Sequence, residues 1–291
     1  TAPASEVKLG ESATFTAAVS AGEAVHPNQK VTWSVSGGTS VSTRITSDGV
    51  LTVGADELVG GTLTVRALST VDNTTFATYS VTVLSSWDTT GLGNMAVGTL
   101  ETVTLDGRDW YLLARDGNKA LIWAKEMETT FGTDGVDVFD GIANNNNSGD
   151  NVWETSSARE WLNGTYLTGL STLQSHAVQT SINTRSEYNA DTWITTQDKV
   201  FLLSEADLFG THKSTATSEA KDYTYGTSQL VTDVNMRKCD TTIDPEYWLR
   251  SPRGSQYSVA YCYASTGDIS NVGAARSWHG VRPALWVNLA G

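Results

Sequence analysis

Basic residues are scarce in this chain. Its 291 residues include 19 Lys and Arg against 32 Asp and Glu, which gives a formal net charge of −13 and a pI near 4.6. Such a chain lacks the basic face that a binder of phosphate backbones needs, so we expect no nucleic-acid partner. No apolar run approaches the roughly 20 residues that cross a bilayer, so we expect no membrane insertion. The chain opens without a charged and apolar leader, which predicts that any signal peptide is absent or already removed.

Cysteine is also rare. Only Cys239 and Cys262 occur, too few for a disulfide framework and not at the spacing of metal ligands. One bridge between them would suit an oxidising compartment. Two buried free thiols fit at least as well, because Cys is among the most often buried residue types. The sequence leaves both alternatives open.

Recognisable catalytic motifs are missing too. The four histidines are scattered, and none stands four residues from another. The sequence has no Gly-rich phosphate loop, no zinc-binding His-Glu-x-x-His helix and no Gly-x-Ser-x-Gly elbow. We therefore expect a protein that is not an enzyme, with no catalytic residues and no cofactor.

Acidic clusters offer only weak candidates for chemistry. Asp134, Asp137 and Asp140 recur at every third position, but they lack the glycine and terminal Glu of a calcium-binding EF-hand loop. The pairs Glu126/Glu128 and Asp240/Asp244 could act as acid and base, yet such pairs are common in an acidic chain. We expect no metal site.

Residues 1–86 alternate between apolar and polar residues and are rich in Val, Thr, Ser and Gly. Short strands between turn clusters are predicted at residues 8–19, 30–35, 49–53, 61–67 and 75–84. Strands of this length and spacing indicate an all-β sandwich.

Three segments of this region resemble the bacterial Ig-like (group 2) family. They are residues 31–35, 45–53 and 60–67. The resemblance implies that Trp33 packs between the two sheets and that the turn at residues 47–49 joins two strands. It also implies a spacer or adhesive stalk on surface or virion proteins.

The pattern changes in residues 87–291. A hairpin is predicted around Asp106-Gly107, and a further strand at 119–124. Helices are predicted from a capping box at Ser157, over 170–179, and over 204–209, with a strand at 199–203 between the last two. The mixture predicts an α+β domain with irregular connections, following the all-β domain.

Two segments near the C-terminus flank a third segment of unusual composition. Residues 247–252 (Tyr-Trp-Leu-Arg-Ser-Pro) and 280–289 (Gly-Val-Arg-Pro-Ala-Leu-Trp-Val-Asn-Leu) flank residues 253–279, which contain no Lys, Glu, Leu, Met, Phe or Pro. The enclosed segment is dominated by Ser, Tyr, Gly and Ala, a mixture that binding surfaces favour. We expect Arg250 and Arg282 to bond carbonyls or carboxylates that fix its ends.

Five segments of residues 87–291 resemble modules with a C-type-lectin fold, which formylglycine-generating enzymes share. They are residues 110–113, 157–163, 200–205, 248–252 and 280–287. The last two are similar to the variable proteins of diversity-generating retroelements, in which copying errors at adenines alter the 3′ end of a gene. The resemblance implies that the lectin fold displays the altered residues as a ligand-binding surface.

The composition of residues 253–279 agrees with this resemblance. Randomising the adenines of an AAC or AAT codon never yields Lys, Glu, Met, Gln or Trp. Only Gln256 and Trp278 break this rule, so we interpret them as fixed parts of the surface.

Alternation over residues 257–264 predicts a strand with two different faces. Tyr257, Val259, Tyr261 and Tyr263 share one face, and small residues occupy the other. We expect the tyrosines to form a surface patch, although core aromatics are the alternative. The predicted ligand-binding residues are Arg253, Ser255, Gln256, Tyr257, Tyr261, Tyr263, Asp268, Ser270, Asn271, Arg276, Ser277, Trp278 and His279.

The function expected from these patterns is non-enzymatic binding of a protein or glycan on another cell or particle. The protein would be extracellular, on a virion or cell surface. A static calcium-dependent carbohydrate-binding adhesin is the first alternative, but its Glu-Pro-Asn, Gln-Pro-Asp and Trp-Asn-Asp motifs are missing. An oxidase resembling formylglycine-generating enzymes is the second, but Cys262 has no near C-terminal partner.

Overall fold

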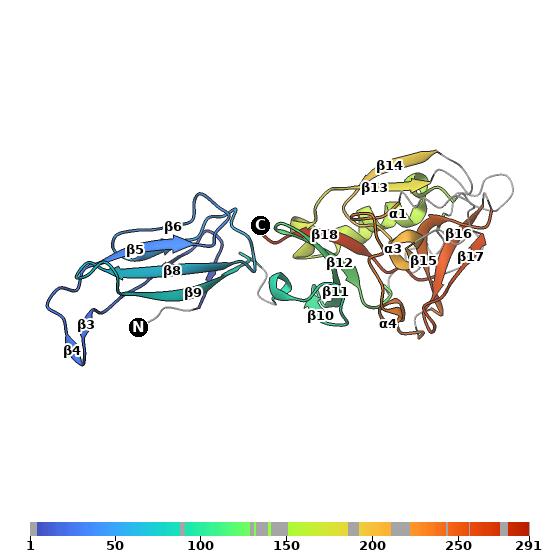
Figure 1. The fold of residues 1–291 in the computed structure, drawn as a ribbon. Coiled ribbons are helices and arrows are strands. Elements are labelled where there is room, and N and C mark those ends of the chain that lie inside the picture. Colours follow the sequence, from blue (N-terminus) through green and yellow to red (C-terminus); the bar gives the residue numbers. More distant parts are fainter. Residues whose placement is uncertain are drawn as a thin grey trace. The chain divides into compact units, whose positions relative to one another are not determined.

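A computed structural model describes most of the chain. The described residues are 5–87, 91–128, 131, 139–140, 151–185, 192–210, 222–242, 244–255, 257–273 and 279–290. The chain forms two compact units, Thr1–Asn94 with Leu289–Gly291, and Met95–Asn288. Both consist mainly of β-strands, and the helices are few and short (Figure 1). In the described residues, none of the helices has the length and apolar character of a membrane span.

The first unit contains two small sheets and a hairpin (Figure 1). One sheet has the order β1 (Glu6–Lys8), β9 (Phe76–Leu84), β8 (Thr62–Ser69), β5 (Val31–Ser36), with β1 parallel to β9 and the other pairs antiparallel. The other has the order β2 (Ser12–Thr14), β7 (Val50–Thr52), β6 (Arg44–Ile45), and β3 (Ser20–Ala21) pairs with β4 (Ala24–Val25). These sheets bury alternate residues of β8 together with Leu51, Val81 and Val83.

The strand predicted at residues 8–19 is wrong in its extent. β1 ends at Lys8 and β2 covers only Ser12–Thr14. Gly10 between them has φ of 76°, a left-handed conformation that turns the chain and interrupts the strand.

The turn expected at residues 47–49 does join two strands. Gly49 has φ of +80°, and a Cβ there would lie 2.4 Å from the carbonyl oxygen of Phe15 and about 3.0 Å from the ring of Trp33. Glycine therefore permits both the turn and the close approach of the Trp33 ring. Trp33 is half-buried, with its ring centroid 6.3 Å from that of Phe15.

The second unit contains three antiparallel sheets (Figure 1). The largest has the order β10 (Thr102–Leu105), β11 (Arg108–Asp116), β12 (Lys119–Ala124), β18 (Ala284–Asn288). β13 (Thr180–Arg185) pairs with β14 (Trp193–Asp198), and the third sheet has the order β15 (Glu246–Pro252), β16 (Ser258–Tyr263), β17 (Ile269–Gly273). The short helices are α1 (Ser157–Trp161), α2 (Leu173–His176), α3 (Glu205–Phe209) and α4 (Val234–Arg237).

Turn chemistry placed some elements of this unit correctly. The hairpin at Asp106-Gly107 is confirmed, with φ of 50° and 75° at the two residues. The strand at 119–124 is confirmed, and α3 begins one residue after its predicted start, in a capping box formed by Ser204 and Asp207.

Other expectations for this unit are wrong. The cap of α1 is Ser156, whose side chain accepts from the backbone N–H of Arg159, and not Ser157. The helix expected over 170–179 covers only Leu173–His176. Residues 199–203 form no strand, because only Phe201 pairs there, in an isolated bridge with Ala284.

Candidate functional site

Two fully buried arginines, Arg250 and Arg282, flank the segment 253–279 and form hydrogen bonds near its two ends. Arg250 lies in β15, and its Nη1 donates to the carbonyl of Leu202 (2.6 Å), to Asp207 Oδ2 (3.1 Å) and to Thr224 Oγ1 (3.1 Å). Its Nη2 donates to the carbonyl of Asp222. The expected bonds to carbonyls and carboxylates are thus confirmed for Arg250.

Arg282 makes the corresponding contacts at the other end. Its guanidinium donates to the carbonyls of Ala124, Met236 and Arg237 at 3.1–3.2 Å. Its Cζ also lies 3.6 Å from the centroid of the Trp123 ring. Arg250 thus donates to the carbonyls of Leu202 and Asp222, which lie outside the strands, and Arg282 donates to carbonyls at the end of β12 and in α4. These bonds fix the frame around the segment.

Strand β16 lies between β15 and β17 and has two unlike faces. Ala260, Cys262 and the following Ala264 are fully buried, as the small-residue face predicted. On the other face, Trp248 of β15 stands opposite Tyr261, and Ser270 of β17 stands opposite Tyr261 from the other side. Residues directly opposite in a ladder point to the same face, so this face gathers the aromatic rings.

The rings on this face pack against one another. Tyr261 and Tyr263 have centroids 5.2 Å apart at 80°, and the Tyr261 hydroxyl donates to that of Tyr263 at 3.0 Å. The ring of His279 lies 4.6 Å from Tyr261 and 4.4 Å from Trp248. Tyr261 is only 8% exposed and His279 7%. These two side chains therefore lie beneath the surface, whereas Tyr257 and Tyr263 are half-exposed.

Two carboxylates adjoin this aromatic group. Glu246 begins β15 opposite Tyr263, and its Oε2 lies 3.1 Å from Nδ1 of His279. Asp244 Oδ1 lies 3.9 Å from the same nitrogen. Burial raises the pKa of Asp244, and burial together with the charge of Asp244 raises that of Glu246. Burial, together with the hydrogen bond to Tyr263, raises the pKa of Tyr261 to about 12. We call Asp244, Glu246, Trp248, Tyr261, Tyr263 and His279 the aromatic–acid cluster.

The structure brings together only some of the predicted binding residues. Tyr261, Tyr263, Ser270 and His279 share one face. Asn271 stands opposite Ala260 on the other face, where its side chain lies beside Gly254. Gln256, Arg276, Ser277 and Trp278 lie outside the described residues.

The remaining predicted residues stand apart from the aromatic–acid cluster. Nη1 of Arg253 donates to the buried Glu205 at 2.6 Å. Ser255 shares a 2.8 Å hydrogen bond with Ser258, and its carbonyl accepts from the buried Asn151. Asp268 is exposed in the turn before β17.

Sequence reasoning missed Glu246 and Asn151 and considered Asp244 only as an acid–base candidate. A signal for Glu246 exists, because Glu246 and Trp248 alternate along one strand as Tyr261 and Tyr263 do along the next. This alternation places Glu246 beside Tyr263 only when the register between β15 and β16 is known. The contact of Asn151 spans more than a hundred residues and has no local signal.

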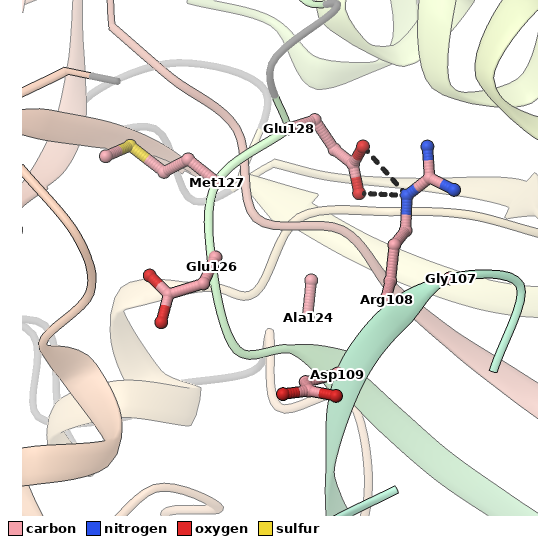
Figure 2. A pocket seen from close by; sticks show the side chains of 7 residues that line it. All are labelled: Gly107, Arg108, Asp109, Ala124, Glu126, Met127 and Glu128. Atoms are coloured by element: carbon pink, nitrogen blue, oxygen red, sulfur yellow. Dashed lines mark hydrogen bonds and ion pairs between the residues drawn. The ribbon is translucent and has the colours of Figure 1, made fainter. Parts of the chain in front are cut away.

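A cavity of about 520 Å³ is lined by residues 107–109, Ala124 and residues 126–128 (Figure 2). Figure 2 shows Arg108 and Glu128 pointing toward one another, with Nε of Arg108 donating to both carboxylate oxygens at 2.7 and 2.9 Å. Glu128 also accepts from the Tyr166 hydroxyl at 2.8 Å. Glu126 accepts from the backbone of Asp240. Glu128 thus bonds to Arg108 and Tyr166, whereas Glu126 bonds to Asp240, so the two carboxylates belong to separate hydrogen-bond networks.

Met127 points away from Glu128 and packs on Gly280 (Figure 2). A Cβ at Gly280 would lie 2.4 Å from Sδ of Met127. A side chain at position 280 would therefore require Met127 to shift.

The family described as "Domain of unknown function (DUF6273)" matches residues 117–289. The chain belongs to this family. No curated protein and no solved structure matches the chain. The DUF6273 region contains β12 to β18, both buried arginines and the whole aromatic–acid cluster. Of the cavity's lining residues, Gly107, Arg108 and Asp109 precede the DUF6273 region.

The other sequence candidates for chemistry are not part of the cluster. Asp134 and Asp137 lie outside the described residues, and Asp140 is buried. Cys239 and Cys262 are free thiols, and burial raises the pKa of each to about 11. They are therefore protonated at neutral pH, which is the less reactive form of a thiol.

Proposed function

We propose that this chain is a non-enzymatic ligand-binding protein that displays a diversified surface, as the variable proteins of diversity-generating retroelements do. The second unit would have a C-type-lectin scaffold, and the first would be an Ig-like stalk. The ligand would be a protein or glycan on another cell or particle, and the protein would act at a virion or cell surface.

The observation that carries this proposal is the contrast between the two faces of β16. On one face, the small residues Ala260 and Cys262 are fully buried, so they attach the strand to the core. The other face carries Tyr261, whose ring packs against His279, and the half-exposed Tyr263, whose hydroxyl accepts from that of Tyr261. Tyrosine supplies contact area at a low entropic cost, which suits a recognition surface.

The buried arginines support the same proposal. A surface that tolerates substitution needs stability from elsewhere, and Arg250 and Arg282 form their hydrogen bonds with residues outside 253–279. Changes within 253–279 would leave those bonds in place. The ion pair between Arg253 and Glu205 differs, because Arg253 belongs to the segment 253–279 and a substitution there would break the pair.

The oxidase alternative receives no support from the thiols. A redox-active cysteine needs an accessible thiolate, whereas Cys262 is fully buried and its pKa is raised. For the carbohydrate-binding alternative, a glycan array with and without calcium gives the test. Signals that depend on calcium would favour a static lectin.

The decisive experiment is sequencing of the source DNA around the gene. We expect a near-identical copy of the region that encodes residues 253–279, different only at adenines of the template, and a reverse transcriptase gene nearby. Clones from one population should differ within this segment and agree at the codons for Arg250, Gly280 and Arg282. Absence of both the repeat and the reverse transcriptase would overturn the diversified-surface proposal.

A further inference from the structure

Three side chains of the aromatic–acid cluster have the chemistry of metal ligands. Asp244, Glu246 and His279 each offer one ligand atom, and these atoms lie within 4.8 Å of one another. His279 and Glu246 come from segments that are far apart in sequence. The backbone holds them together, because Gly280 N–H donates to the Glu246 carbonyl and its own carbonyl accepts from Trp248 N–H, both at 2.9 Å.

The separations between these atoms suit a shared ion. Zinc binds His nitrogen and carboxylate oxygen at about 2.0–2.2 Å, so two ligands of one tetrahedral ion stand roughly 3.4 Å apart. Nδ1 of His279 is 3.1 Å from Glu246 Oε2 and 3.9 Å from Asp244 Oδ1. Small rotations of the two carboxylates would bring all three atoms to the same ion.

The surroundings orient the histidine for this role. Its ring lies against Trp248 and Tyr261, with centroids 4.4 and 4.6 Å away, so it has little freedom to turn. The imidazole is 7% exposed and directs Nδ1 toward the two carboxylates. Packing of this kind fixes a ligand before the ion arrives, which lowers the entropic cost of binding.

Charge balance favours a divalent cation over a proton. The two half-buried carboxylates lie close to one another and carry two negative charges when ionised. A protonated imidazole would neutralise only one of them. A divalent ion bound by neutral imidazole neutralises both, and a donor set of one nitrogen and two oxygens suits zinc and its neighbours in the transition series.

We propose that Asp244, Glu246 and His279 bind one divalent transition-metal ion, with zinc as the expected occupant. The site adjoins the face of β16 that carries Tyr261 and Tyr263, which we call the tyrosine face. Three protein ligands leave a coordination position for water or for an oxygen of a bound ligand. Tyr263, which stands opposite Glu246 in the sheet, is a half-exposed aromatic residue beside this site. The ion site goes beyond the proposed function, because it requires no ligand and no sequence diversification.

The test is titration of metal-depleted full-length protein with ZnCl₂ by isothermal titration calorimetry. We expect one ion per chain with a Kd on the order of 1 μM. Zinc at about 100 times the Kd should raise the melting temperature of the second unit by about 5 °C or more. Asp244→Asn, Glu246→Gln and His279→Ala should each weaken zinc binding at least tenfold.

The controls separate this site from adventitious binding. His26→Ala removes a histidine of the first unit, and Asp268→Asn removes an exposed carboxylate in the turn before β17, so both variants should bind zinc as the parent does. Asp244→Asn and Glu246→Gln preserve side-chain shape, so they test the site even where His279→Ala fails to fold.

A second readout reports on the ligands directly. Co²⁺ in place of zinc should give visible absorption bands that are lost in Glu246→Gln, and it should quench Trp fluorescence, because the His279 ring lies against Trp248. No saturable binding by the parent protein would overturn the proposal. Zinc binding of equal strength in all three ligand variants would overturn it too. Neither result depends on whether the surface is diversified.

Discussion

Both compact units hold loops with buried charged side chains: the first uses a carboxylate, and the second uses two arginines together with buried carboxylates such as Asp207. In the first unit, Glu57 is 1% exposed and accepts hydrogen bonds from the backbone and hydroxyl of Thr39, both at 2.6 Å, and from the hydroxyl of Thr43 at 2.5 Å. In the second unit, Arg250 and Arg282 donate to carbonyls. In the first unit a buried carboxylate thus satisfies loop donors. In the second, buried guanidinium groups satisfy backbone acceptors, while the buried Asp207 accepts from the backbone N–H groups of Ser204 and Thr224.

This difference has a consequence for how each unit responds to its environment. A guanidinium stays protonated at every accessible pH, whereas a carboxylate can be neutralised by acid. Bonds from charged groups are stronger than neutral ones. The two guanidinium groups therefore keep their charge when acid is added, whereas the loop around Glu57 loses its charged acceptor.

The largest expected effect is the loss of Arg282. Arg282→Met leaves the carbonyls of Ala124, Met236 and Arg237 without their donor, and we expect the second unit to lose about 3 kcal/mol of unfolding free energy. Urea denaturation measures this loss. Lys119→Met, which removes an exposed cation from β12, is the matched control and should change stability little. Equal stability of the two variants would show that Arg282 does not hold the frame.

Acid should act on the first unit through Glu57. Burial alone would raise the pKa of Glu57, but hydrogen bonds from Thr39 and Thr43 outweigh it and lower the pKa to about 2. The lowered pKa means that this stability is fully present above the unfolded value of 4.5 and is lost as pH falls from 4.5 toward 2. We expect Glu57→Gln to cost on the order of 2 kcal/mol at neutral pH and to flatten the acid dependence between those values.

Thermal denaturation of the first unit from pH 6 to pH 2 would measure this dependence. Glu11→Gln changes an exposed carboxylate of the same unit and serves as the control. An acid profile of Glu57→Gln that matches the parent would contradict the role given to Glu57.

A neutral donor should have a smaller effect than a buried arginine. Asn151 is fully buried, and its Nδ2 donates to the carbonyls of Ser255 (2.9 Å) and Ser258 (3.2 Å). We expect Asn151→Ala to cost about 1 kcal/mol in the urea denaturation of the second unit. Asn235→Ala, at an exposed position of α4, should cost less. A loss as large as that of Arg282→Met would mean that charge is not what separates the two kinds of donor.

The smallest expected effect concerns the tyrosine face. Tyr263→Phe removes the hydroxyl that accepts from Tyr261, but Tyr263 is half-exposed and water can replace it. We expect a change below about 0.5 kcal/mol. Tyr261→Ala should cost more, because that ring is covered and its removal leaves a cavity. A larger loss for Tyr263→Phe than for Tyr261→Ala would reverse the assignment of surface and interior on this face.

Local chemistry accounts for the parts of the fold that the sequence predicted. Asp106-Gly107 marks a hairpin because both residues accept a positive φ. Strand β12 could be predicted because its apolar run is bounded by turn residues. The small-residue face of β16 was predicted from alternation alone.

The failures share a physical cause in tertiary structure. Residues 199–203 were predicted to form a strand because residues 200–203 are apolar, yet these four are buried without a continuous ladder partner. The predicted surface patch includes Tyr261 and His279, whose rings are covered by neighbours from β15 and by each other. The aromatic–acid cluster depends on the register between β15 and β16 and on the return of the chain at Gly280, and neither follows from local pattern.

Gly280 sets a limit of another kind on this chain. Met127 fills the space where any side chain at position 280 would stand. A side chain there would require Met127 to move from its present position, whereas Asn271, nine residues earlier, has an exposed side chain. Substitution at position 280 is therefore limited by volume, and one methionine sulfur sets that limit.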